Sequence, residues 1–349
     1  MVKRKNVTIY DIAKEAQVSP ATVSRVLTGN AKVSSDKQER IQQVIDKYNF
    51  RPNALAKGLS NSRRQIIGMI AADIRNPFYS QLFVACEMAA DQRGYTLLVC
   101  DGFSTRKLEE KQLDKLVAQR VDAIIQIGGA VDDLISDLDY VELVNRVAND
   151  IPIIINGKLD GADCYQVNID HCQGVELAME YLVALGHQKI AFIGGCTHVK
   201  SSIDKRQKFL QMIKRYMLEC PDEFIVLNGD YDQRGGYESM KRILQSGQVP
   251  TAVVAINDLT ALGIMSAIIE AGLSIPRDIS VIGADNSQVV EGISPRLTSI
   301  DYDYNLVGEK IIETAINAIE KKEQPRVYET KVNLVIREST GKCKYKKGM

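Results

Sequence analysis

The first fifty residues alternate hydrophobic and polar positions with the period of short helices. Thr8 is the expected N-cap of the first helix. The apolar residues after it share one helical face: Ile9, Ile12, Ala13 and Ala16. After the three-residue turn QVS, a second helix is predicted from Ser19-Pro20 through Leu27, and a third from about Ser35 to Lys47. This is the helix-turn-helix pattern, although any small three-helix domain shows the same period.

From residue 65 onward, short apolar runs alternate with longer amphipathic segments. The runs are of the type found in buried parallel strands: QIIGMIAAD, YTLLVCDG, VDAIIQIGG, IPIIING, KIAFIGG, EFIVLNGD, TAVVAIND and ISVIGADN. The segments between most of them have helical periodicity, as in PFYSQLFVACEMAADQRG and LTALGIMSAIIEAG. This alternation predicts a doubly wound α/β fold with parallel sheets. There are too many such units for one sheet of ordinary size, so we expect two sheets and therefore two lobes.

The charge is distributed unevenly along the chain, although the total is zero. Residues 1–64 contain 13 Lys and Arg against 5 Asp and Glu, whereas residues 65–349 contain 31 and 39. A basic N-terminal segment on an acidic body favours a polyanionic partner for that segment. A basic run is more often a solvated face, so a second line of evidence is needed.

The second predicted helix supplies that evidence through its polar face. Thr22, Ser24 and Arg25 alternate with Val23 and Val26, which we expect to turn inward. An Arg side chain can donate two hydrogen bonds to O6 and N7 of guanine, and Ser and Thr can reach phosphates or base edges. The helix therefore has the chemistry of one that reads the DNA major groove.

Motifs for catalysis, metals and nucleotides are missing from the sequence. No GxGxxG, GxxxxGK[ST] or GxSxG segment follows a strand run, and the seven cysteines are never spaced as CxxC. We expect His187, near a predicted helix C-terminus, to be structural, since a cation suits that end of the helix dipole. The sequence therefore predicts neither an enzyme nor a cofactor or metal site.

Polar residues stand where the predicted strands end. Ligands of doubly wound sheets lie beyond the carboxyl ends of the strands. The residues found there are Asp73 to Asn76, Asp101, Asn156, Asp230-Tyr231, Asn257-Asp258 and Asp285-Asn286. The body therefore has candidate ligand groups at this edge of each sheet.

The N-terminal segment resembles the DNA-binding head of the lac repressor/galactose repressor family of bacterial transcription regulators. VTIYDIAKEAQVSPATVSRVLTG and VSSDKQERIQQVIDKYNFRPNALAKGL carry the likeness, and TVSRVL is its most specific part. The resemblance implies a head over residues 1–50 and a hinge over 51–64, in which Leu59 would enter the DNA minor groove. Without the family resemblance, the alternative is that Leu59 is an ordinary leucine of a flexible linker. The predicted DNA-binding residues are Thr8, Tyr10, Ser19, Pro20, Ala21, Thr22, Ser24, Arg25, Asn53 and Leu59.

The body is similar to the same family over residues 65–340. IRNPFY, VNIDHCQGVELAMEYLVALGHQKIAFIGG, VPTAVVAINDLTALG and SPRLTSID carry this likeness. It implies a periplasmic-binding-protein fold, with two lobes around an effector cleft and three crossings of the chain. The effector residues that it implies are Arg75, Phe78, Tyr79, Asn156, Lys205, Tyr231, Asn257, Asp285 and Tyr302. Aromatic faces with amides and charged groups suit a carbohydrate.

Two departures from the family pattern leave the effector class open. Lys205 stands where the family commonly has Arg, and Asn156 where it often has an acidic residue. Lys205 keeps the positive charge of an arginine, whereas Asn156 removes a negative charge and Arg75 adds a positive one, so the local charge shifts toward cation. An anionic ligand, such as a sugar acid or sugar phosphate, and a neutral sugar in a re-tuned pocket are both compatible with the sequence.

We therefore expect a homodimeric repressor of a carbohydrate-use operon, bound to double-stranded operator DNA and controlled by a small sugar-like effector. The basic tail 341–349 has no heptads, so it does not predict a tetramerising helix. No apolar stretch predicts a membrane span or a secretory signal, which favours the cytoplasm. The main alternative is a soluble sugar-binding protein with a vestigial DNA-binding head.

Overall fold

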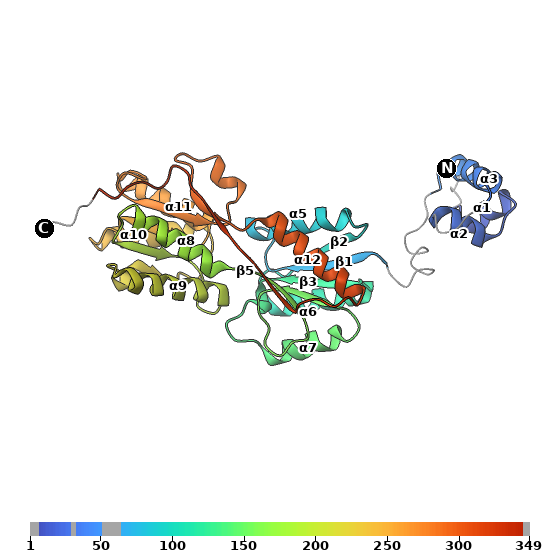
Figure 1. Cartoon of the computed structure of the whole chain (residues 1–349), viewed down its shortest axis with the longest axis horizontal. Helices are drawn as coiled ribbons and strands as arrows, with labels where there is room; N and C mark the ends of the chain where they lie inside the picture. The colour runs from blue at the N-terminus through green and yellow to red at the C-terminus, as the bar shows by residue number, and fades with distance from the viewer. Residues whose placement is uncertain (1–6, 29–32, 51–63, 345–349) are drawn as a thin grey trace, which may run out of the picture. The chain divides into compact units, whose positions relative to one another are not determined.

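The computed structural model describes residues 7–28, 33–50 and 64–344. The chain separates into two compact units, Met1–Arg64 and Gln65–Met349, which we call the head and the body (Figure 1). Asn53 and Leu59, two of the predicted DNA-binding residues, lie outside the described residues. Among the described residues, no helix is both long and apolar enough to cross a membrane.

The head contains the three predicted helices: α1 (Ile9–Glu15), α2 (Pro20–Thr28) and α3 (Ser35–Tyr48). Thr8 caps α1 as expected, since its side chain accepts from the Asp11 amide while the Asp11 carboxylate accepts from the Thr8 amide. One small core holds the helices together; its fully buried side chains include Ile12, Val23 and Ile41. The predicted three-helix head is confirmed.

The body is built from two six-stranded sheets with helices against them (Figure 1). The first sheet has the order β11-β5-β4-β3-β1-β2, and its neighbouring strands are parallel. Its strands are β1 (Ile66–Ala71), β2 (Thr96–Asp101), β3 (Ala123–Ile127), β4 (Ile153–Asn156), β5 (Tyr165–Ile169) and β11 (Val327–Thr330). Its helices are α5 (Pro77–Asp91), α6 (Arg106–Gln119), α7 (Leu138–Ala148) and α12 (Tyr304–Ile319). We call this part lobe 1.

Lobe 2 contains the second sheet, in the order β12-β10-β9-β8-β6-β7. Only its β10–β12 pair is antiparallel among the described strands. Its strands are β6 (Ile190–Ile193), β7 (Ile225–Val226), β8 (Ala252–Ala255), β9 (Ser280–Ala284), β10 (Thr298–Asp301) and β12 (Asn333–Val335). Its helices are α8 (His171–Ala184), α9 (Lys200–Tyr216), α10 (Gln233–Gln245) and α11 (Asp258–Glu270), and three short 3-10 helices complete the body (Gly129–Val131, Asp222–Phe224 and Gln288–Glu291).

The chain passes between the lobes three times: from β5 to α8, from β10 to α12, and from β11 to β12. Two parallel sheets and two lobes were predicted, and both are confirmed. The four strands next to these crossings, however, were not recognised in the hydrophobic pattern. β11 and β12 are only partly buried, and β10 buries Thr298 and Ser299, so none of these three strands forms an apolar run.

Close helix packing in lobe 2 depends on glycine. A Cβ on Gly236 of α10 would lie 2.1 Å from the Thr260 carbonyl oxygen, and one on Gly263 of α11 would lie 1.9 Å from the Gln233 carbonyl oxygen. Both distances are far below van der Waals contact. The two helices can therefore approach at this distance only because neither position carries a side chain.

His187 is structural, but the dipole argument for it was wrong. Its side chain is buried, with Nδ1 3.1 Å from Thr251 Oγ1 and Nε2 3.0 Å from the Gly341 carbonyl oxygen. Burial lowers the pKa of His187, and the contact with Gly341 only partly offsets this effect. The neutral ring therefore ties the start of the C-terminal tail to lobe 2, and Cys343 extends the contact by donating its amide to Leu185.

Candidate functional site

The head presents the polar side chains of α2 at its surface. Ser19 and Thr22 are engaged in capping: Ser19 Oγ accepts from the Thr22 amide and lies 2.8 Å from Thr22 Oγ1. Ala21 and Arg25 are exposed one turn apart, whereas Val23 between them is fully buried. The inward and outward faces of α2 are thus divided as a groove-reading helix requires.

The other predicted DNA-binding residues of the head surround this face. Tyr10 is exposed, Pro20 is the first residue of α2, and Ser24 is partly buried. Thr8 is exposed, but its hydroxyl is committed to Asp11. In the described part of the predicted DNA surface, the side chains of Thr8, Ser19 and Thr22 take part in helix capping, and the side chains of Tyr10, Ala21 and Arg25 are exposed.

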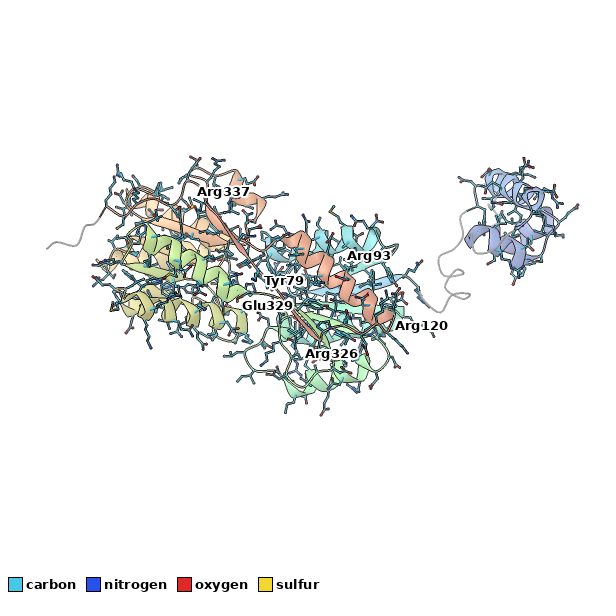
Figure 2. All side chains as sticks on the ribbon, in the orientation of Figure 1. Tyr79, Arg93, Arg120, Arg326, Glu329 and Arg337 are labelled. Carbon is cyan, nitrogen blue, oxygen red and sulfur yellow. The ribbon has the colours of Figure 1, made fainter. Side chains whose placement is uncertain are left out.

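A cleft of about 810 Å³ lies between the two lobes of the body. The predicted effector residues all line it: Arg75, Phe78, Tyr79, Asn156, Lys205, Tyr231, Asn257, Asp285 and Tyr302. They come from strand ends and helix starts on both sheets, and Figure 2 shows Tyr79 near the junction of the lobes. The structure thus brings together residues that are widely separated in sequence.

Aromatic rings form one wall of the cleft. Phe78 lies edge-on to Tyr79, Tyr302 and Tyr304, at centroid distances of 5.1, 6.0 and 5.9 Å. His171 packs against Tyr302 in the same manner at 5.2 Å. Edge-to-face packing fixes the ring planes. The wall therefore offers a pre-formed apolar surface of the kind that contacts the C–H face of a sugar ring.

Lys205 reaches the cleft from the second turn of α9. Its Nζ donates to the Tyr302 hydroxyl at 3.2 Å and to the Ile256 carbonyl oxygen at 3.3 Å. Burial lowers the pKa of Lys205, while the carboxylates of Asp285 and Asp132 oppose that shift. The amino group is thus held by Tyr302 and Ile256, and acidic residues of both lobes favour its charged form.

Asp285 follows β9 in a strained backbone conformation. Its φ of 102° lies in a region that favours glycine, and the side chain is buried. Burial raises the pKa of Asp285 well above its usual range, the nearby Asp258 adds to this, and Lys205 opposes it. Strain and a buried carboxyl group together mark a position of the type found at ligand sites.

Amide side chains in the cleft mainly support its loops. Asn156, at the end of β4, donates to the Val167 carbonyl oxygen of the neighbouring strand β5 at 2.8 Å. Asn257 caps α11 through Thr260 and also donates to the Tyr231 carbonyl oxygen at 2.8 Å. The Tyr231 hydroxyl in turn lies 2.6 Å from Ser202 Oγ of α9. These groups hold the strand ends in place around the cleft.

Arg75 does not add an unpaired positive charge to the cleft. Its Nε and Nη2 donate to the two carboxylate oxygens of Asp73 at 2.8 and 2.7 Å. This bidentate pair, in which the arginine is largely exposed, neutralises the positive charge that Arg75 adds in the sequence. The argument for a cationic shift in the cleft therefore loses one of its two supports and retains only the missing acidic group at Asn156.

Several residues lining the cleft were missed in the sequence. They are Glu109, Asp132, His171, Cys196 and Ser201. Glu109 lies in an amphipathic segment whose charges look solvated, yet its side chain is buried. Asp132 follows the GG turn after β3, so a strand-end search could have found it. Within the described residues, no group of His, Cys, Asp and Glu is arranged to hold a metal ion.

The head and the cleft together define a class of protein. A helix-turn-helix unit with an outward polar face, joined in one chain to a two-lobed receptor-like body, is a DNA-binding transcription regulator. More specifically, the chain belongs to the lacI family of bacterial regulatory proteins. The family model of that description matches residues 8–53, and the model of a periplasmic binding protein-like domain matches residues 179–340.

Known proteins resemble the chain over most of its length. Catabolite control protein A of Staphylococcus epidermidis is 33% identical over 326 residues, which cover 92% of this chain and 95% of the relative. The crystal structure of the lac repressor dimer bound to operator and the anti-inducer ONPF is 29% identical, with a TM-score of 0.87, and the match covers 97% of this chain and all of that one. The structure of a LacI family regulator from Enterococcus faecium with bound ribose is 27% identical, with a TM-score of 0.70. That match covers 80% of this chain and 100% of the E. faecium chain. The predicted family, fold class and regulatory function are confirmed.

Proposed function

We propose that this regulator is a homodimeric repressor of a carbohydrate-use operon and that a neutral sugar in the interlobe cleft controls its operator affinity. The observation that carries the proposal is the cleft itself, in which an aromatic wall faces hydrogen-bonding groups from both lobes. The lac repressor structure, which is a dimer on operator DNA, and the ribose-bound E. faecium regulator support both parts of the proposal.

The charges in the cleft favour a neutral ligand over an anion. Arg75 is paired with Asp73, and the negative charges of Asp285 and Asp132 oppose the lowering of the pKa of Lys205 by burial. An anion would have to compete with these carboxylates for the Lys205 ammonium group. Sugar hydroxyls, in contrast, can donate to Asp285 and accept from Lys205 at the same time. A neutral polyhydroxy compound therefore satisfies both groups.

The predicted residues take specific roles in this proposal. Arg25 and Ala21 read base edges from α2, and Tyr10 contributes to the surface that meets the DNA backbone. In the body, Phe78 and Tyr79 contact the apolar face of the sugar, while Lys205 and Asp285 hydrogen-bond its hydroxyls. Asn156, Tyr231, Asn257 and Tyr302 complete the cleft, and Arg75 lies at its rim.

We also propose that the protein acts in the cytoplasm, where its DNA target lies, and that it is not an enzyme. The alternative, a soluble sugar-binding protein with a vestigial head, is disfavoured by the state of the head. Its core is complete, with Ile12, Val23 and Ile41 fully buried. Arg25 stays at the surface. A head without a function would not need to keep a buried apolar face and an exposed polar face on α2.

Selection of binding sites from a random DNA library, followed by measurement of operator affinity with and without sugars, tests the proposal. D-ribose, D-glucose, D-galactose and cellobiose, each with its sugar acid or phosphate where one exists, are suitable probes. We expect one or more neutral sugars to raise the melting temperature of the full chain and to weaken operator binding. Lys205→Ala should abolish both responses, and Lys208→Ala is the matched control because Lys208, on the same helix, pairs with Glu176. A response to the anionic compounds alone would contradict the neutral-sugar assignment.

A further inference from the structure

Helix α9, which carries Lys205, has no N-cap of its own. The residue before it is Val199, whose side chain accepts no hydrogen bond. The other long helices of lobe 2, in contrast, are capped by their own preceding residue: Asp170, Asp232 and Asn257. The first amides of a helix need an acceptor from elsewhere when no cap is present.

For α9, lobe 1 provides that acceptor. Oδ1 of Asp132 accepts from the Ser201 amide at 3.0 Å, and Oδ2 accepts from the Ser201 hydroxyl at 2.6 Å. The backbone carbonyl oxygen of Asp132 accepts from the Lys200 amide at 2.7 Å. A single residue of lobe 1 thus binds the first two residues of a lobe 2 helix.

The backbone extends this contact between the lobes. The Leu134 amide donates to the His198 carbonyl oxygen at 2.7 Å, and Asp133 forms an antiparallel bridge with Val199. Residues 132–134 of lobe 1 and 198–201 of lobe 2 therefore make a short paired segment that is separate from the three crossings of the chain. Asp132 and Ser201 also line the effector cleft, so this contact forms part of its boundary.

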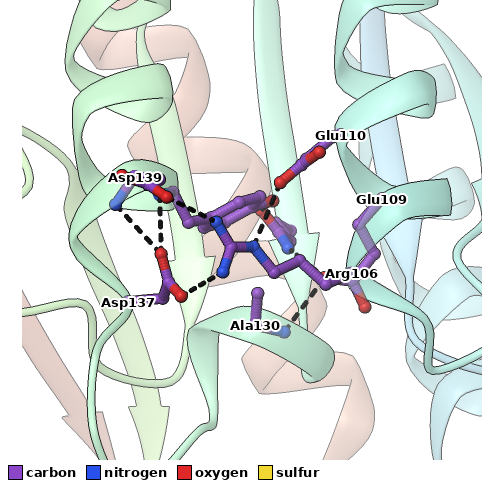
Figure 3. A network of polar contacts seen from close by, with 8 residues as sticks. Arg106, Glu109, Glu110, Ala130, Asp137 and Asp139 are labelled. Carbon is purple, nitrogen blue, oxygen red and sulfur yellow. Dashed lines mark hydrogen bonds and ion pairs between the residues drawn. The ribbon is translucent and has the colours of Figure 1, made fainter.

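A buried polar network holds the turn that carries Asp132. Glu109 Oε2 accepts from the Ala130 amide at 3.0 Å and from Gln126 Nε2 at 3.2 Å (Figure 3). Tyr140 donates its hydroxyl to Gln126 Oε1 at 2.7 Å. A Cβ on Gly129, whose φ is 65°, would lie 1.9 Å from Glu109 Oε1, so the carboxyl group packs directly against the turn. Asp132 is therefore presented to α9 from a fixed support.

We propose that Asp132 is an interlobe latch that caps α9 and thereby keeps the two lobes closed around the cleft. Lys205 lies four residues after Ser201 on the same helix, and the negative charge of Asp132 opposes the lowering of the pKa of Lys205 by burial. Opening the latch removes the cap of α9 and the counter-charge of Lys205 together. Any effect of the latch on the response to an effector rests on the proposed function, whereas the contact between Asp132 and α9 does not depend on it.

Hydrogen exchange of the full chain, without any sugar, tests the latch. Asp132→Ala should raise exchange about tenfold in two segments, residues 196–203 and residues 130–136, because one cap is typically worth about that factor. β8 (Ala252–Ala255), in the core of lobe 2, should exchange as in the wild type. Asp133→Ala is the matched control, since it removes the neighbouring carboxylate and leaves Asp132 in place. If Asp132→Ala does not fold, Asp132→Asn, which keeps an acceptor for the Ser201 amide, should give a smaller rise in both segments.

A second substitution separates a latch from a simple helix cap. Val199 has the extended backbone of an N-cap, with φ −96° and ψ 123°. In the Asp132→Ala background, Val199→Asp should return protection to the first turn of α9 but leave residues 130–136 exposed to exchange. Recovery of both segments, or a rise confined to α9 in Asp132→Ala alone, would show that Asp132 only caps the helix. Because no sugar is present, either result is independent of whether the cleft binds one.

Discussion

Glu109→Gln is expected to change how the stability of the body depends on pH. The Glu109 side chain is only 1% exposed, and burial raises its pKa from 4.5 to about 7, with Asp133 and Glu110 adding to the shift and the Ala130 amide and Gln126 opposing it. Oε1 has no hydrogen-bond partner among the described residues, so the ionised form is poorly solvated. A glutamine keeps an oxygen for Ala130 and Gln126 but carries no charge.

The sign and size of the effect follow from linkage. Because the pKa is higher in the folded state, the folded protein retains this proton while the unfolded chain loses it. Stability from this group is therefore full below about pH 4.5 and declines as the pH rises to about 7. A shift from 4.5 to about 7 corresponds to about 3 kcal/mol at roughly 1.4 kcal/mol for each pKa unit. Between pH 5 and pH 8, the free energy of unfolding of Glu109→Gln should therefore increase, relative to that of the wild type, by most of this difference of about 3 kcal/mol.

Urea unfolding of both proteins at pH 5, 6, 7 and 8 measures this difference directly. We expect the stability of Glu109→Gln relative to the wild type to rise by about 2–3 kcal/mol across the series. Glu110→Gln is the control, since its partly exposed carboxylate pairs with Arg106 and such pairs contribute less than about 1 kcal/mol. A stability difference that stays constant with pH would refute the reasoning, because Glu109 would then be ionised at no cost in the fold.

Three further substitutions test other parts of the molecule. Arg25→Ala should weaken binding to a selected operator by about 1–3 kcal/mol while leaving random DNA nearly unaffected, as measured by fluorescence anisotropy on both DNAs. Lys205→Ala should reduce sugar affinity by about tenfold or more in titration calorimetry, since Asp285 would lose its counter-charge, and operator affinity should persist. Ile12→Ala should destabilise the head by about 2–5 kcal/mol in thermal unfolding, because the side chain is fully buried there; a change below about 1 kcal/mol would mean that the head core is not cooperative.

The head could be predicted from sequence because its signals are local. The Thr8 capping box and the Ser19-Pro20 start define two helices without reference to the rest of the chain. The apolar residues that face one another across the helices, such as Ile12 and Ile41, then follow from helical spacing. The eight strands that form apolar runs were also found from local signals, since burial on both faces gives most of them, such as β3 and β8, a continuous hydrophobic sequence.

Long-range polar contacts could not be predicted in this way. In the sequence, Glu109 is one charge among many on an amphipathic helix, and residues distant from that helix pattern, such as Gly129 in the turn after β3, bury it. Asp132 acts on a helix that starts 68 residues later, a pairing that no local pattern encodes. The Asp73–Arg75 pair, in contrast, spans two residues and could have been recognised, which would have removed the apparent positive charge of the cleft.

The most direct test of the account is the operator affinity of the full chain as a function of salt, measured with and without the neutral sugar that stabilises it most. The head carries 13 Lys and Arg against 5 Asp and Glu, so contacts with roughly six to ten phosphates should give a slope of roughly −5 to −9 in log affinity against log salt. The sugar should weaken binding to the selected operator but not change binding to random DNA. A flat salt dependence, or operator affinity that no sugar alters, would contradict the account.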